Sequence, residues 1–158
     1  MRIFLKFTVY FTVYTNFVCF VIVSYGTMFM SARERQLTAE QHAEIAVACL
    51  KEYMEDFQER NPNFYVFNAV MHLDEATPHL HIDYIPLGHF FNGLEKRNAM
   101  ARALEEMGYG KGANAINRWR LSEWKVLHDI CAKHGFEINE PKKSRGYSFT
   151  TPCRYDRR

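Results

Sequence analysis

The chain has 158 residues, is 47% hydrophobic, 24% charged and 15% aromatic, and carries a formal net charge of +2. These values suit one globular domain with its own core and exclude a low-complexity chain. Four scattered cysteines without a Cys-x-x-Cys pair exclude a zinc ribbon and a disulfide scaffold, and they favour a reduced, cytoplasmic compartment.

The charge is distributed unevenly along the chain. Residues 31–93 carry four Lys/Arg and ten Asp/Glu, a balance of −6, whereas residues 94–158 carry fourteen and eight, a balance of +6. A basic half beside an acidic half is compatible with a polyanionic ligand. Ordinary solvated helix faces would give the same pattern, so charge alone does not decide.

The N-terminus begins with Arg2 and Lys6 and continues as an apolar run over residues 7–30. A signal peptide or membrane anchor has this charge pattern. However, the run is rich in β-branched and aromatic residues and lacks a small-residue cleavage site, which favours a β-strand or a leader from a displaced start. We therefore expect a hydrophobic leader over residues 1–30, with membrane association as the alternative to a cytoplasmic protein, and a domain over residues 31–140.

A helix and two strands are predicted next. Residues 38–41 have the sequence of a capping box, and the apolar residues behind them recur at helical spacing until Asn61-Pro62. Residues 64–72 are apolar on both sides, which is typical of a central strand. Residues 79–85 alternate, and the short turn before them predicts an antiparallel hairpin.

The last part of the chain predicts helices over residues 96–107 and 114–134, separated by a glycine-rich loop. A polar, basic tail over residues 141–158 is expected to be poorly ordered. The fold class is therefore α+β: an antiparallel sheet with a central metal-binding hairpin, flanked by helices.

Three histidines and three carboxylates lie within residues 72–83. Two histidines alternate along the second strand and share a face, and the turn folds the third back beside them. Three converging imidazoles suit a divalent metal with open positions for water or substrate. The candidate ligands are His72, His79, His81 and Glu75. Asp74 and Asp83 are candidates to orient these ligands, and a hairpin whose histidines only form hydrogen bonds is the alternative.

The run from His72 to Pro86 resembles the histidine motif of plasmid mobilisation relaxases of the Pre/Mob (plasmid recombination enzyme, MobV-type) family. These are HUH endonucleases, named for a His-hydrophobic-His pair, here His79-Leu80-His81. The similarity includes the Asp-Glu-x-Thr-Pro turn and extends over roughly residues 40–130. A partial HUH relaxase fold is the expectation that follows.

The resemblance implies that the three histidines, with Glu75 assisting, hold Mn²⁺ or Mg²⁺ at the scissile phosphate of single-stranded DNA at an origin of transfer. A nucleophile then forms a covalent protein–DNA intermediate. In this family the nucleophile lies in an N-terminal strand motif of His-Asn-x-Arg type, and residues 1–60 contain none. His42 lies in a predicted helix instead. We therefore expect a truncated member that keeps the metal-binding half of the active site.

Contacts to the DNA backbone are expected from basic residues in the glycine-rich loop and the last helix. These residues are Lys111, Arg118, Arg120 and Lys125. Two hypotheses of function stay open: a metal-dependent DNA strand transferase, and a remnant that binds metal and single-stranded DNA without nicking it. The missing nucleophile motif favours the second. A zinc-dependent hydrolase with Glu75 as general base is a third.

Overall fold

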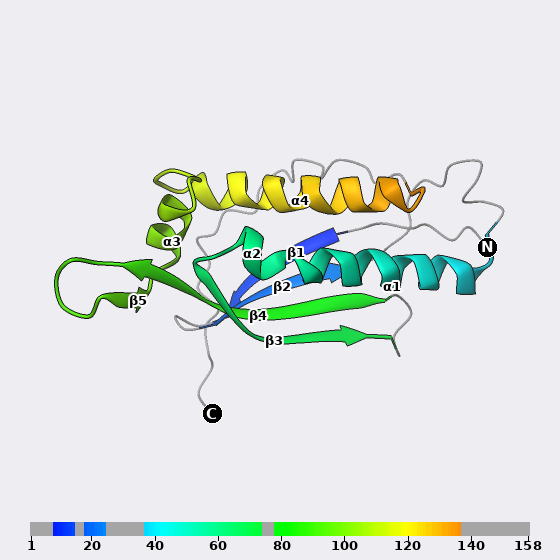
Figure 1. The fold of residues 1–158 in the computed structure, drawn as a ribbon, viewed down its shortest axis with the longest axis horizontal. Coiled ribbons are helices and arrows are strands. Elements are labelled where there is room, and N and C mark those ends of the chain that lie inside the picture. The colour runs from blue at the N-terminus through cyan, green and yellow to red at the C-terminus, as the bar shows by residue number, and fades with distance from the viewer. Residues whose placement is uncertain (1–7, 15–17, 25–36, 74–77, 137–158) are drawn as a thin grey trace, which may run out of the picture.

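A computed structural model describes residues 8–14, 18–24, 37–73 and 78–136 (Figure 1). The elements are β1 (Thr8–Tyr14), β2 (Val18–Ser24), α1 (Ala39–Glu55), α2 (Phe57–Arg60), β3 (Phe64–His72), β4 (His79–His89), β5 (Lys96–Asn98), α3 (Met100–Glu106) and α4 (Ala115–Lys133). The predictions for Asp74, Glu75 and the tail over residues 141–158 lie outside the described residues.

The strands form an antiparallel sheet in the order β1-β2-β4-β3, and β5 pairs with the far end of β4. This confirms the predicted α+β class. The central strand is β4, whereas β3 lies at the edge, so the prediction of a central strand over residues 64–72 was wrong. The apolar side chains that suggested burial on both faces, Tyr65, Phe67 and Val70, are exposed.

Two segments of the apolar N-terminal run form strands, as their β-branched composition indicated. β2 pairs with β4 so that Ser24 lies opposite His79 and Ile22 opposite His81. Part of the segment predicted as a leader therefore shares the sheet with the histidine strand. Across the described ranges, no helix has the length and apolar character needed to cross a membrane.

The helices cover the sheet face that carries the even-numbered residues of β4 (Figure 1). Tyr84 is 1% exposed, and its ring stacks on Phe64 at 4.4 Å and lies 6.2 Å from that of Trp119 on α4. Burying a large apolar side chain stabilises the fold by about 1.5–3 kcal/mol. This aromatic contact therefore fixes α4 against the strand pair that carries the histidines.

The capping box at the start of α1 is confirmed. The Thr38 side-chain oxygen accepts from the Gln41 backbone N–H at 3.2 Å, and Gln41 Oε1 accepts from the Thr38 N–H at 2.8 Å. The helical segment predicted up to Asn61-Pro62 is interrupted at Asp56, where α1 ends and the short helix α2 begins.

The helix predicted over residues 96–107 begins later than expected. Residues 96–98 form β5, which pairs with residues 87–89, and α3 covers only Met100–Glu106. The strand predicted over residues 79–85 is longer than expected, because proline lacks only the N–H and the Pro86 carbonyl still accepts from the Ala99 N–H at 2.9 Å. β4 therefore continues to His89 and forms a second hairpin with β5.

A buried polar cluster joins α1, α2 and α4. Glu123 is 1% exposed, and its carboxylate accepts from the Tyr53 hydroxyl at 2.7 Å, Asn61 Nδ2 at 3.1 Å and Arg60 Nη2 at 3.2 Å. Asn61 Oδ1 accepts in turn from Trp119 Nε1 at 2.7 Å. Because both carboxylate oxygens accept hydrogen bonds, these partners offset the desolvation cost of burying the carboxylate in the helix layer.

Candidate metal centre

The end of β3 and the start of β4 bring the three histidines together. His72 and His79 are direct partners in the antiparallel ladder, and His81 follows two residues along β4, opposite Val70. Side chains of directly opposed residues share a face of the sheet, as do residues two apart on one strand. The register of this hairpin therefore places all three imidazoles on the face that the helices leave uncovered.

The three rings form an almost equilateral triangle. Their centroids are 4.9 Å apart for His72 and His79, 4.8 Å for His72 and His81, and 5.0 Å for His79 and His81. One nitrogen from each ring lies within 4.8 Å of the other two. The convergence expected from the sequence is confirmed.

The environment of the triangle suits a bound ion. His79 is 8% exposed, whereas His72 and His81 are half-buried, so the cluster is partly open to solvent. Imidazole nitrogens are common ligands of divalent transition metals, and three of them leave further coordination positions for water or a substrate oxygen. These residues therefore fit a divalent metal that retains open positions.

Asp83 lies two residues beyond His81 on the same face. Its Oδ2 accepts from Asn68 Nδ2 at 2.8 Å, and Asn68 is its partner in the ladder. The other oxygen, Oδ1, is buried and has no hydrogen-bond partner in the described part of the chain. Buried carboxylate oxygens are rarely unpaired, so this acceptor is available to a ligand or a water at the centre.

Sequence reasoning missed Asn68. The signal was present, because counting back by twos from His72 along a strand places residues 70 and 68 on the face of the histidines. A β-bulge between Val66 and Asn68 breaks the simple alternation of β3 beyond that point. The amide fixes the rotation of Asp83, which leaves the free oxygen of the carboxylate in a defined place.

The basic residues predicted to contact DNA do not lie at the histidine cluster. Lys111 lies in the connection between α3 and α4, and Arg118 lies in the first turns of α4. Arg118 Nε donates to the Tyr109 carbonyl at 2.6 Å, and Lys111 forms an ion pair with Glu105 at 3.2 Å.

Two further basic residues from that prediction lie on α4. Arg120 is half-buried, and desolvation lowers the pKa of its guanidinium. Lys125 is exposed in the middle of α4. A contact with DNA through these residues stays a prediction.

Two residues of α1 with potentially nucleophilic side chains, His42 and Tyr53, are buried. His42 is 6% exposed, and its ring meets Phe136 edge-on at 5.7 Å. Tyr53 is fully buried, and burial together with the neighbouring Glu123 raises the pKa of its hydroxyl well above the usual range. A tyrosine that deprotonates so reluctantly is a poor nucleophile at neutral pH.

An antiparallel sheet that holds three converging histidines beside a helix layer defines the chain as an α+β protein with a candidate metal centre. A family model described as plasmid recombination enzyme matches residues 21–105, which contain β3, β4 and all three histidines. The match covers more than half of the chain, so the chain belongs to the plasmid recombination enzyme family. No curated protein and no solved structure gives a significant match.

Proposed function

We propose that this chain binds a divalent metal through His72, His79 and His81 and holds a phosphate of single-stranded DNA there, at an origin of transfer. Family membership supports a role in plasmid recombination or mobilisation. The observation that carries the proposal is the triangle of imidazoles within 4.8 Å of one another. All three histidines lie within the part of the chain that the family model matches.

A bound divalent cation would polarise the phosphate and stabilise the charge that develops during strand transfer. The ladder pairing of His72 with His79 presets two ligands, and the alternation of β4 presets the third. Asn68 orients Asp83, whose free oxygen can accept a hydrogen bond from a histidine ring or from water. The chain's own contribution is therefore a set of metal ligands fixed on two paired strands, β3 and β4.

We propose Mn²⁺ rather than Mg²⁺ as the metal. Mg²⁺ prefers oxygen ligands and keeps several waters, whereas the described ligand set consists of three nitrogens. Glu75 would add an oxygen ligand or assist at the phosphate. Since plasmid DNA is cytoplasmic, the proposal also places the protein in the cytoplasm.

Binding without nicking is the form of this function that the sequence favours. Strand transfer needs a positioned nucleophile as well as a charge-stabilising ion, and residues 1–60 contain no His-Asn-x-Arg motif. The basic residues Lys111, Arg118, Arg120 and Lys125 are proposed as contacts to the DNA backbone. We therefore propose recognition of the strand at the metal, with no covalent step carried by the chain alone.

A labelled origin-type oligonucleotide tests this proposal in two assays. Fluorescence anisotropy should show tighter binding with Mn²⁺ than with EDTA, and His81→Ala should remove that difference while His128→Ala, on α4, retains it. A denaturing gel should show no covalent adduct with saturating Mn²⁺. Equal affinity with Mn²⁺ and with EDTA would refute the metal site. An adduct that survives denaturation would refute binding without nicking.

A further inference from the structure

The hairpin formed by β4 and β5, here called the arm (residues 87–98), extends away from the helices and the rest of the sheet (Figure 1). At its tip Phe91 is 100% exposed and Leu94 is 71% exposed. Phe91 therefore gains no burial from folding of this chain, and Leu94 gains little. An aromatic side chain held clear of the surface on a paired hairpin is suited to contact with another molecule.

The arm is held by contacts within the hairpin and, at its base, by α3, since the His89 N–H donates to Glu106 at 3.0 Å. The Phe90 N–H donates to the Glu95 carbonyl at 2.8 Å, and Arg97 Nη2 donates to the Asn92 carbonyl at 3.2 Å. The guanidinium of Arg97 lies over the Phe90 ring, 3.8 Å from its centroid. The cation is therefore placed in advance, which lowers the entropy cost of binding an anion.

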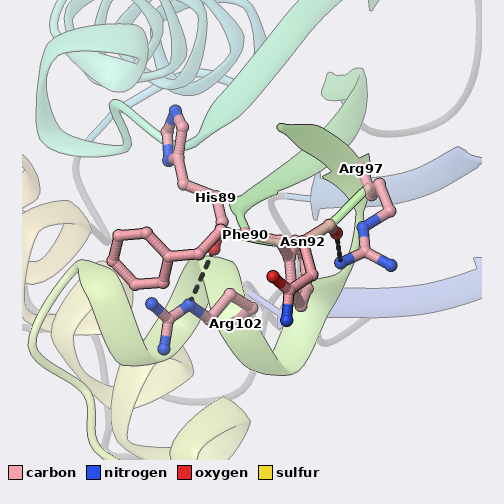
Figure 2. A pocket seen from close by; sticks show the side chains of 6 residues that line it. His89, Phe90, Asn92, Arg97 and Arg102 are labelled. Atoms are coloured by element: carbon pink, nitrogen blue, oxygen red, sulfur yellow. Dashed lines mark hydrogen bonds between the residues drawn. The ribbon is translucent and has the colours of Figure 1, made fainter. Parts of the chain in front are cut away.

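A hollow of about 330 Å³ lies at the base of the arm (Figure 2). It is lined by His89, Phe90, Phe91, Asn92, Arg97 and Arg102. Arg102 is already engaged, because its Nε donates to the His89 carbonyl and to Glu106. Arg97 has five N–H groups, and one of them reaches a carbonyl. Its remaining donors are available to a phosphate, and none of the described residues that line the hollow is a carboxylate.

We propose that the arm is a second contact for single-stranded DNA, in which Arg97 and Lys96 bind phosphates and Phe91 stacks on a base. The proposal rests on the proposed function for the presence of DNA, and it adds a contact outside the histidine cluster. Guanidinium and ammonium groups beside an exposed aromatic ring match the two chemistries of a single strand, its charged backbone and its bases.

The continuity of β4 connects the arm with the histidine cluster. The strand spans 11 residues, with His79 and His81 at its start and His89 at its end. At about 3.3 Å per residue, these ends are about 33 Å apart. One DNA strand held at the metal can therefore extend along β4 and reach the arm, so that both contacts act on the same molecule.

The test uses the full chain and a fluorescein-labelled 30-nucleotide single strand in anisotropy titrations. Phe91→Ala should weaken binding about tenfold, because stacking on an aromatic side chain contributes on that scale. Leu121→Ala is the matched control, since Leu121 is a 46% exposed apolar residue on α4, and it should bind as the parent does. Lys96→Ala should reduce the salt slope by about 0.7, whereas Lys51→Ala, on α1, should not.

The same titrations with a duplex, and the melting temperature of the parent with Mn²⁺, separate the arm from the metal site. Unchanged affinity of Phe91→Ala together with an unchanged salt slope of Lys96→Ala overturns the arm. A loss of duplex binding by Phe91→Ala equal to its loss of single-strand binding overturns the assignment to single strands. Arm variants that weaken binding in EDTA, while Mn²⁺ leaves the parent's melting temperature unchanged, support the arm and refute the metal. No binding by the parent overturns both.

Discussion

The two sides of β4 differ in what they contribute. On the helix side, Leu80, Ile82 and Tyr84 are at most 3% exposed and belong to the core. On the other side, His81 and Asp83 are half-buried and face the candidate metal centre. Successive side chains of a strand point to opposite faces. In β4, alternate residues therefore either stabilise the core or face the candidate metal centre. Substitutions on the two sides should therefore have different effects, which can be measured separately.

The largest effect is expected in the helix layer, at Glu123. Glu123→Ala removes the acceptor of Tyr53, Arg60 and Asn61, which leaves the buried Tyr53 hydroxyl and Asn61 amide without this partner and takes the carboxylate from Arg60, whose side chain is 21% exposed. The free energy of unfolding should fall by about 3–5 kcal/mol. Urea denaturation followed by circular dichroism measures it. Glu123→Gln keeps one acceptor and should lose less, and a loss below about 1 kcal/mol in the alanine variant would contradict a structural role.

The comparison of the two faces is tested most directly by two apolar truncations in the same hairpin. Ile82 is fully buried, whereas Val70 is 40% exposed and lies opposite His81. Ile82→Ala should cost about 3 kcal/mol of unfolding free energy, and Val70→Ala less than about 1 kcal/mol. Equal losses in urea denaturation would show that the histidine face is covered.

On the histidine face, His79→Ala should alter metal binding more than stability. A ligand bound only to the folded state stabilises it by about 2.7 kcal/mol at one hundred times its dissociation constant. Mn²⁺ should therefore raise the melting temperature of the parent in differential scanning fluorimetry, and His79→Ala should abolish most of that shift. His128→Ala serves as the control, because His128 contacts Asp129 on α4. If Mn²⁺ raised the melting temperature of His79→Ala as much as that of the parent, the proposed metal centre would be refuted.

Alternation made the histidine hairpin predictable from the sequence. Local rules also gave the capping box at Thr38 and helix α4 to within a residue at either end. The edge position of β3 was not predictable, because apolar side chains such as Tyr65 and Phe67 suggest burial whether or not anything covers them.

Contacts with other segments of the chain explain the other differences. Residues 96–98 have helical composition, yet they pair with β4 because the strand continues past Pro86. Glu123 resembles a solvated residue of an amphipathic helix, and its partners come from residues more than sixty positions earlier. The site was more predictable than the fold around it, because its ligands lie in one local hairpin whereas the helix layer depends on distant partners.

The smallest effect is expected at the surface joint between α1 and α4. Lys133 Nζ lies 2.8 Å from Glu52 Oε1 and His134 Nε2 lies 2.9 Å from Oε2. Hydrogen bonds from Lys133 and then His134 hold the pKa of Glu52 below its ordinary value of 4.5. A carboxylate whose pKa is lowered by folding stabilises the folded state above the unfolded pKa, and this contribution is lost as the pH falls through the folded pKa.

Glu52→Gln should therefore reduce stability slightly at neutral pH and flatten the decline in stability below about pH 4.5. Urea midpoints measured from pH 7 to pH 3 test this, with Glu55→Gln as the control, an exposed carboxylate on the same helix. An acid decline as steep in Glu52→Gln as in the parent would mean that the ion pairs do not contribute. The Mn²⁺ response at pH 7 should be the same in both variants, because this joint belongs to the helix layer and shares no residue with the histidine face.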